Sequence, residues 1–447
     1  MPNKQTLLIR QAKVVNEGQI KILDILVEGE FITEISPHIE SSADIEIHAE
    51  GKILLPGLID DQVHFREPGL THKGTIETES RAAVAGGITT FFEMPNTNPQ
   101  TTTWAEFENK INIAKHSSWA NFGFKFGGTN DNLHQVLAVD PCRVPGIKLF
   151  LGSSTGNMLV DNTEVLRDIF LNTKLPISVH CEDEQTIRRN MATFTKKYGE
   201  EIPISCHPQI RSEEACYKSS STAVALAKET GARLHVFHLS TAKETELFES
   251  DPAVESKTIT SEVCIHHLWF SDADYADKGS LIKWNPAVKT AHDRARLWEA
   301  LNDDRIDIIA TDHAPHTIGE KMNSYRKAPS GGPMVQHALS VLLECHLLGK
   351  ISIEKIVQKM SHNPAKLFDI DRRGFVREGY YADLVLVDMN APYTVSKHNI
   401  LYKCGWSPFE GQTFRSQVTH TIINGSLVYE QGRFSNQKVA MPVTFIR

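Results

Sequence analysis

The 447-residue sequence has no excess of basic residues, few cysteines and no long apolar run. Lys and Arg number 47 against 55 Asp and Glu, and the net charge of −8 argues against nucleic-acid binding or an anionic membrane surface. Its seven Cys include no Cys-x-x-Cys pair and do not indicate a disulfide framework. No apolar run reaches the length of a membrane span, and the N-terminus lacks the apolar core of a signal peptide. We therefore expect a cytoplasmic enzyme without nucleic-acid or membrane partners.

The 20 His residues are the unusual feature of the composition, and several of them end short apolar segments. Eight such segments alternate with helix-like stretches: ILLPGLIDDQVHF, ITTFFEMPN, FGFKFGG, GIKLFLG, PISVHCED, RLHVFHLS, TITSEVCIHH and IDIIATDHAPH. Eight parallel strands, each followed by a helix, are typical of the (β/α)8 TIM barrel, whose active site lies at the C-terminal ends of the strands. An open doubly wound sheet is the alternative, but it does not explain why polar side chains end so many strands.

Both ends of the chain are rich in short strand-like segments, which differ from the alternating pattern between them. We expect residues 1–55 and 369–447 to combine in one small β-sandwich domain beside a barrel formed by residues 56–368. The predicted fold class is therefore α/β, a TIM barrel with a β-domain built from both chain ends.

Side chains that can bind a metal gather at the predicted strand ends: Gln62, His64, Lys148, His180, His238 and Asp312. Imidazole and carboxylate groups suit zinc, and a catalytic site needs about three protein ligands and an open position. A lone His is more often structural, but three of them with Asp312 on separate strands favour a metal site. His235, three residues before His238, is predicted to face the helices by strand alternation.

Lys148 is the exception in this set, because an ammonium group cannot bind a cation. It either pairs with a carboxylate in the barrel wall, or CO2 converts it to an anionic carbamate that bridges two metals. The sequence leaves both possibilities open.

Seven motifs in order between about residues 50 and 370 resemble those of the dihydroorotase family, within the amidohydrolase superfamily: DDQVHFREPG, EMPNTNP, GIKLFLG, SVHCED, HVFHLS, KWNPAV and ATDHAPH. The flanking segments, including GYYADLVLVD, resemble the composite β-sandwich of this and the hydantoinase branch. The resemblance implies zinc-dependent, reversible cyclisation of N-carbamoyl-L-aspartate to dihydroorotate in pyrimidine biosynthesis, carried out by a homodimer.

The resemblance also implies a role for each matching residue. Three positions match histidine metal ligands: His64, His180 and His238. Lys148 matches a carboxylated bridging lysine, and Asp312 matches a metal-bound general acid/base. Four positions match groups that contact substrate: Arg66, which binds the substrate carboxylate, its partners Asn96 and His316, and Asn285. The segment from Ala328 to Gly332 resembles a loop that meets the pyrimidine ring through its backbone.

Gln62 departs from the family, whose first strand normally carries His-x-His. Its amide oxygen is a neutral and harder ligand than imidazole and binds zinc less tightly. Alternatively, Gln62 is a hydrogen-bond donor beside the ligands, and one of two metal sites is weakened or empty. We therefore expect one or two zinc ions.

Two other functions compete with dihydroorotase activity. Another cyclic amidase, acting on hydantoins, dihydropyrimidines or allantoin, would share the metal ligands. Arg66 and Asn96 argue against it, because a neutral ring leaves a buried arginine without an anionic partner. A non-catalytic partner of aspartate carbamoyltransferase is the second alternative, motivated by Gln62. The candidate for a mobile active-site loop is GSSTGN, from Gly152 to Asn157.

Overall fold

The computed structural model describes residues 5–152 and 158–447 and places a strand in each of the eight predicted segments. The third segment is interrupted at Lys125 and carries two strand labels. The strands are β6 (Leu58–Val63), β7 (Ile88–Glu93), β8 (Asn121–Phe124), β9 (Phe126–Gly127), β10 (Ile147–Phe150), β11 (Ile177–His180), β12 (Leu234–Val236), β13 (Ile259–Cys264) and β14 (Ile308–Ala310).

All of these strands pair in parallel. One sheet has the order β6-β7-β8, and a second has the order β9-β10-β11-β12-β13-β14. The last strand also meets the first, since Val63 and His313 form a parallel bridge and the His64 N–H donates to the His313 carbonyl at 2.7 Å. Because parallel strands share a direction, their C-terminal residues gather at one end of the sheet.

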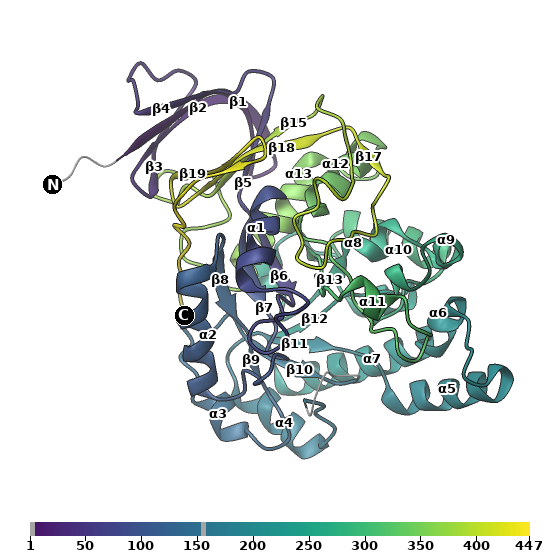
Figure 1. The fold of residues 1–447 in the computed structure, drawn as a ribbon. Helices are drawn as coiled ribbons and strands as arrows, with labels where there is room; N and C mark the ends of the chain where they lie inside the picture. The colour runs from purple at the N-terminus through teal and green to yellow at the C-terminus, as the bar shows by residue number, and fades with distance from the viewer. Residues whose placement is uncertain (1–4, 153–157) are drawn as a thin grey trace.

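Helices follow these strands and cover them from outside (Figure 1). Polar side chains cap the N-termini of most of the long helices, as Thr75 and Asp183 do for α1 and α5. The longer helices are α1 (Ile76–Ala85), α2 (Trp104–Ser117), α4 (Thr163–Asn172), α5 (Glu184–Tyr198), α7 (Glu213–Thr230), α10 (Ala291–Asn302) and α12 (Ala338–Leu347). The shorter ones are α3 (Leu133–Leu137), α6 (His207–Ile210), α8 (Ile265–Trp269), α9 (Tyr275–Lys278), α11 (Ile318–Lys321), α13 (Ile353–Val357) and α14 (Asn363–Leu367).

The two chain ends meet in a separate nine-stranded sheet, in which purple N-terminal and yellow C-terminal strands lie together in Figure 1. Its strands are β1 (Thr6–Asn16), β2 (Gln19–Glu28), β3 (Phe31–Ser36), β4 (Ile45–His48), β5 (Ile53–Pro56), β15 (Leu384–Asp388), β18 (Gln417–Ile423), β19 (Ser426–Glu430) and β20 (Arg433–Phe434). Antiparallel pairing of β5 with β15 joins the two halves. Leu54, Leu384 and Ile422 pack in one apolar core there. A small hairpin, β16 (Tyr393–Thr394) and β17 (Thr413–Phe414), stands apart. Strands from both chain ends thus lie in one sheet.

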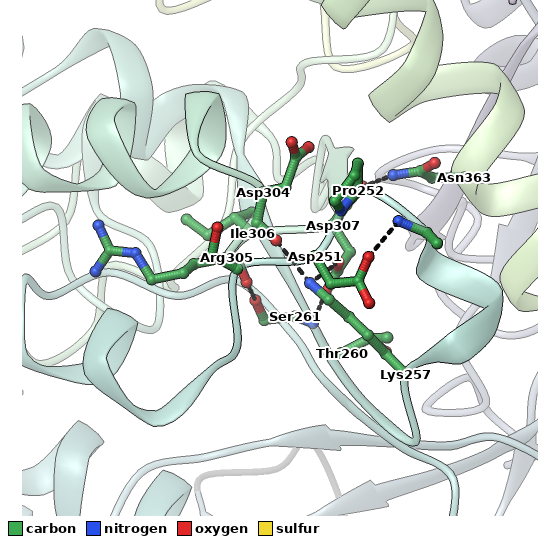
Figure 2. A network of polar contacts seen from close by, with 12 residues as sticks. Asp251, Pro252, Lys257, Thr260, Ser261, Asp304, Arg305, Ile306, Asp307 and Asn363 are labelled. Carbon is green, nitrogen blue, oxygen red and sulfur yellow. Dashed lines mark hydrogen bonds and ion pairs between the residues drawn. The ribbon is translucent and has the colours of Figure 1, made fainter.

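An ion-pair network lies at the N-terminal ends of β13 and β14, away from the metal-capable side chains (Figure 2). The buried Lys257 ammonium donates to an Asp307 carboxylate oxygen at 2.7 Å and to the Asp304 carbonyl at 2.6 Å. Asp307 also accepts from the Ser261 N–H at 2.9 Å. Burial raises the pKa of Asp307, and Lys257 opposes that rise. At this end of parallel strands such a network serves stability.

Lys257→Met is expected to lower the free energy of unfolding by about 3–5 kcal/mol, because it leaves the buried Asp307 carboxylate without its cation. Denaturant unfolding followed by circular dichroism measures the change. Lys366→Met is the matched control: Lys366 pairs with Glu255 at 3.1 Å, but the side chains are 37% and 53% exposed. Loss of this exposed ion pair should lower the free energy of unfolding by at most about 1 kcal/mol. Equal losses in the two variants would contradict a stabilising role for the buried pair.

Within the described ranges, none of the helices is both long enough and apolar enough to cross a bilayer.

Candidate active site

A cavity of about 200 Å³ opens at the C-terminal ends of the parallel strands. All six predicted metal-capable residues and four of the predicted substrate-contacting residues line it: Gln62, His64, Lys148, His180, His238, Asp312, Arg66, Asn96, Asn285 and His316. Phe150, Trp284, Ala314 and residues 329–331 complete the wall. The structure thus brings together side chains that are more than 250 residues apart in the sequence.

His64 and Asp312 meet at one side of this cavity. The Nε2 atom of His64 lies 3.1 Å from Oδ1 of Asp312, and its Nδ1 lies 2.9 Å from Oδ1 of Asn96. Since an amide oxygen only accepts, Nδ1 of His64 carries the proton and Nε2 presents a lone pair to the cavity. The Gln62 amide donates to the same Asp312 oxygen at 3.4 Å. Gln62 thus lies beside the candidate ligands.

His180 and His238 form the opposite pair. Nδ1 of His180 lies 2.9 Å from Nε2 of His238, and Nε2 of His180 lies 2.9 Å from a Glu182 carboxylate oxygen. Glu182 is fully buried and also pairs with Arg211. Burial alone would raise the pKa of Glu182, but Arg211 and His180 outweigh it and lower the pKa to about 2. The carboxylate therefore holds the proton of His180 on Nε2 and leaves Nδ1 as the ligand atom.

Lys148 lies on β10, the strand next to β11, and is 1% exposed. Its ammonium lies 4.1 Å from the ring centre of Phe237 and 4.7 Å from that of Phe150. Burial lowers the pKa of Lys148 to about 7, although Glu262 and Asp312 oppose the shift. A substantial share of the amine is therefore neutral near neutral pH, the form that reacts with CO2.

Two nitrogens at this site test whether the residues fit a metal centre. Among the described residues, neither Nζ of Lys148 nor Nδ1 of His238 has a hydrogen-bond partner, although both are buried. Buried polar atoms are rarely left unpaired unless a ligand or ion satisfies them. Together with the lone pairs of His64 and His180, this donor set fits a bound metal.

A second group of residues lies beside the metal-capable set and is cationic. Arg66 is buried and donates through Nε to the Pro315 carbonyl at 3.0 Å, while Nη2 lies 3.0 Å from Nε2 of His316. Lys73 contacts Nδ1 of His316 at 3.0 Å. Burial lowers the pKa of the Arg66 guanidinium to about 10, which leaves it charged at neutral pH. Asn285 lines the cavity, and its side-chain amide oxygen has no hydrogen-bond partner among the described residues.

The loop beyond Tyr325 forms one cavity wall, and two buried lysines hold it. Lys321 donates to the carbonyls of Pro329 and Gly331, at 2.9 and 2.7 Å. Lys283 donates to the carbonyls of Tyr325 and Ala328, both at 2.6 Å. The prediction placed substrate contacts at Ala328 and Gly332. In the structure the three residues between them, 329–331, line the cavity, and these two flank it.

Three residues of the site have positive φ angles: Arg66 at 73°, His238 at 40° and Asp312 at 45°. Non-glycine residues seldom adopt this conformation, and such residues cluster at functional sites. Each lies two or three residues beyond the end of its strand. The turn at each strand end thus aims the side chain.

The prediction for His235 was wrong. Its Nε2 lies 3.4 Å from Asp61 and 3.3 Å from Glu262, so it faces the interior between the strands and not the helices. The reason is that β12 ends at Val236 and the backbone turns at His238, so alternation does not extend from one histidine to the other. The predicted mobile loop, Gly152 to Asn157, lies outside the described residues except for Gly152.

Sequence reasoning missed several residues that shape the site: Glu182, Arg211, Lys283 and Lys321. Glu182 had a detectable signal, because it follows His180 by two residues in SVHCED. Arg211 comes from the segment between β11 and β12, and no local pattern connects it with Glu182. The two lysines act on backbone carbonyls, for which a sequence carries no signal.

A family model described as the amidohydrolase family matches residues 53–428. The chain belongs to the amidohydrolase family. A dihydroorotase of Pyrococcus abyssi is 34% identical to it over 427 residues, which cover 95% of each chain. One of Halobacterium salinarum is 33% identical over 426 residues, covering 95% of this amidohydrolase and 96% of the relative. The solved structure of an L-hydantoinase (dihydropyrimidinase) from Arthrobacter aurescens superposes with a TM-score of 0.93 at 27% identity, covering 99% of this chain and 100% of that one.

Proposed function

We propose that this amidohydrolase is a dihydroorotase, which interconverts N-carbamoyl-L-aspartate and dihydroorotate in pyrimidine biosynthesis. The observation that carries the proposal is the buried, charged Arg66 beside His316 and Asn96, in the same cavity as the metal-capable residues. Its relatives of more than 30% identity that are named dihydroorotase support it. A cavity of about 200 Å³ suits a single-ring substrate.

One or two zinc ions would be held by His64, Lys148, His180, His238 and Asp312, with Gln62 beside them. When bound, zinc polarises a carbonyl and lowers the pKa of water. Carboxylation of Lys148 would satisfy its buried nitrogen. It would also supply an anion between the pair of His64 with Asp312 and the pair of His180 with His238. Asn96 and Glu182 fix the tautomers of His64 and His180, so that each presents a lone pair to the cavity.

Asp312 would move the proton. In the hydrolytic direction its carboxylate accepts a proton as water adds to the ring carbonyl, and it delivers that proton to the ring nitrogen as the C–N bond breaks. In the biosynthetic direction the same oxygen takes the proton from the carbamoyl nitrogen and passes it to the departing carboxylate oxygen, which leaves as water with a second proton drawn from solvent. The Gln62 amide donates to Oδ1 of Asp312 and holds it in place.

Arg66 would orient the substrate through its carboxylate. Two of its nitrogens are held by Pro315 and His316, and its remaining N–H groups can form charge-assisted hydrogen bonds with an anion. The side-chain oxygen of Asn96 accepts from Nδ1 of His64, which leaves its NH2 group to contact the substrate. The side-chain amide oxygen of Asn285 and the backbone of residues 329–331 would contact the ring amides.

We also propose that the eight strands close into a (β/α)8 barrel over residues 56–368, with residues 1–55 and 369–447 forming the β-sandwich. The bridge from Val63 to His313 supports closure, and the pairing of β5 with β15 supports the second domain. A homodimer and an association with aspartate carbamoyltransferase stay predictions.

A hydantoin- or dihydropyrimidine-cleaving cyclic amidase is the second candidate, favoured by the structural likeness to the L-hydantoinase. Its substrates have no ring carboxylate. Arg66 would then lie at the cavity without a substrate carboxylate to pair with, which is costly for a buried charge. The relative rates with charged and neutral rings distinguish the two functions.

Purified protein stripped with a chelator should regain dihydroorotate hydrolysis on stepwise zinc addition in the presence of bicarbonate, as followed by ring absorbance. Gln62→His should need less zinc for half-maximal activity, because imidazole binds zinc more tightly than an amide oxygen. Hydrolysis of neutral rings but not of dihydroorotate would favour the second candidate. No turnover at any zinc concentration, together with a stable complex with aspartate carbamoyltransferase, would favour a non-catalytic partner.

A further inference from the structure

A second group of metal-capable side chains lies inside the fold, separate from the predicted ligand set. Asp61 on β6, His235 on β12 and Glu262 on β13 are fully buried, and one ligand atom of each lies within 4.8 Å of the other two. Asp61 and Glu262 precede Gln62 and Cys264 on their strands, so the cluster lies on the interior side of the active site. We refer to these three residues as the interior cluster.

The distances within the interior cluster suit an ion better than direct hydrogen bonds. Nε2 of His235 lies 3.4 Å from Oδ2 of Asp61 and 3.3 Å from Oε2 of Glu262. A charge-assisted hydrogen bond between such groups is about 2.7–2.9 Å long. Zinc bonds of about 2.0–2.2 Å at tetrahedral angles separate neighbouring ligand atoms by about 3.3–3.5 Å.

The remaining polar atoms of the interior cluster direct free ligand atoms to one point. The Thr260 hydroxyl donates to the Leu234 carbonyl at 3.2 Å, so at 2.9 Å it accepts from Nδ1 of His235. Nε2 of a neutral His235 is then a lone pair facing two carboxylates. Oε1 of Glu262 accepts from the His238 N–H at 3.2 Å, while Oε2 faces Nε2 of His235 at 3.3 Å.

Asp61 gives evidence for a bound cation that is independent of the distances within the cluster. It is 0% exposed, and neither of its carboxylate oxygens has a well-formed hydrogen bond with any described residue. An unpaired buried carboxylate is expensive unless a cation compensates for it. A cation between Asp61 and His235 would compensate for this carboxylate at short range.

We propose that Asp61, His235 and Glu262 bind a divalent cation, zinc by their mixed nitrogen and oxygen donors, at a structural site distinct from the catalytic one. Two carboxylates and one divalent cation make a neutral group, which suits a buried position. The ion would tie β6 to β12 and β13 across the interior. It would thereby support Gln62 and His238, which adjoin the cluster in the chain.

Lys125 is the competing cation. It is fully buried, donates to the Ser178 hydroxyl at 2.9 Å and interacts electrostatically with Asp61 and Glu262. Burial lowers the pKa of Lys125 to about 7 against the opposition of these carboxylates. A neutral Lys125 is therefore accessible when an ion is bound. Without an ion, a protonated His235 between the carboxylates would take its place.

A second cavity adjoins the interior cluster on the side opposite the active site. It has a volume of about 290 Å³, lies at the N-terminal ends of the strands and has His235 and Thr260 in its wall, together with Lys257 and Arg233. His235 thus adjoins a cavity other than the substrate cavity.

Anomalous diffraction at the zinc edge tests the proposal on the wild-type protein, crystallised after dialysis against zinc-free buffer. The expected result is a peak between the three side chains of the interior cluster, whether or not the catalytic ligands also hold zinc. Density for water or a direct contact in place of the peak, with zinc present at the catalytic ligands, would overturn it. An empty catalytic site with an occupied interior cluster would count against the proposed function alone.

Variants give a second readout through the zinc content of dialysed protein. Asp61→Asn should lose one zinc per chain. Asp60→Asn is the matched control, because the neighbouring Asp60 pairs with Thr311 at 2.6 Å and belongs to neither ligand set. Lys125→Met should bind the interior ion at least about tenfold more tightly, since a nearby positive charge is removed. Equal zinc content in wild type and Asp61→Asn would overturn the proposal.

Discussion

Asp312→Asn is expected to reduce kcat for dihydroorotate hydrolysis by about 10²- to 10⁴-fold, the usual contribution of a positioned general acid/base. The amide keeps an oxygen to accept from Gln62 but cannot take up the proton of the attacking water. Because Arg66, Asn96 and His316 are untouched, KM should change little. Steady-state kinetics in both directions, at saturating zinc, measure the effect.

Zinc content and thermal unfolding of the Asp312→Asn protein serve as its controls. If the variant retains zinc and its melting temperature, the loss of kcat reports on proton transfer. A kcat within tenfold of wild type would show that another group moves the proton. A loss confined to variants that have also lost zinc would assign Asp312 to metal binding alone.

Arg66→Met is expected to lower kcat/KM for dihydroorotate by about 30- to 5,000-fold, which corresponds to the 2–5 kcal/mol lost when one partner of a buried charge pair is truncated. The variant removes the planar donors that would face the substrate carboxylate. Dihydrouracil, which has the same ring without that carboxylate, provides the internal comparison. The slower turnover of dihydrouracil should change little. The ratio of kcat/KM for dihydroorotate to kcat/KM for dihydrouracil should therefore fall strongly.

Arg66→Lys is the conservative control. It keeps the positive charge but not the fork of donors held by Pro315 and His316. We expect an intermediate kcat/KM for dihydroorotate. If Arg66→Met slowed both substrates equally, Arg66 would be needed for the shape of the cavity and not for recognition of an anion.

The strand positions and the metal-capable residues could be predicted because both depend on local patterns. Short apolar runs mark the strands, and His64, Lys148 and His180 lie within a strand or directly after it. Parallel direction then brings them to one end without further information. Arg66, two residues beyond His64, was assigned through the family resemblance and not through these patterns.

What escaped prediction depends on where the backbone turns and on partners that are distant in sequence. Strand alternation misplaced His235 because β12 is only three residues long. Sequence gave no reason to join Glu182 with Arg211, or Asp61 with His235 and Glu262, since each pairing forms only in the folded interior. The predicted loop, from Ala328 to Gly332, contains the three residues that line the cavity, but the two lysines that hold it through backbone carbonyls were not predicted.

The pairing of β5 with β15 has a consequence for the synthesis of the protein on the ribosome. Pro56 and Leu384 are direct neighbours in the sheet, yet more than 300 residues of chain are made between them. At about 5–20 residues per second, β5 waits roughly 15–60 s with one edge uncovered. Uncovered strand edges pair readily with other chains. The nascent protein therefore depends on chaperones or on prompt completion of its last strands, and a chain stalled before Leu384 is prone to aggregation.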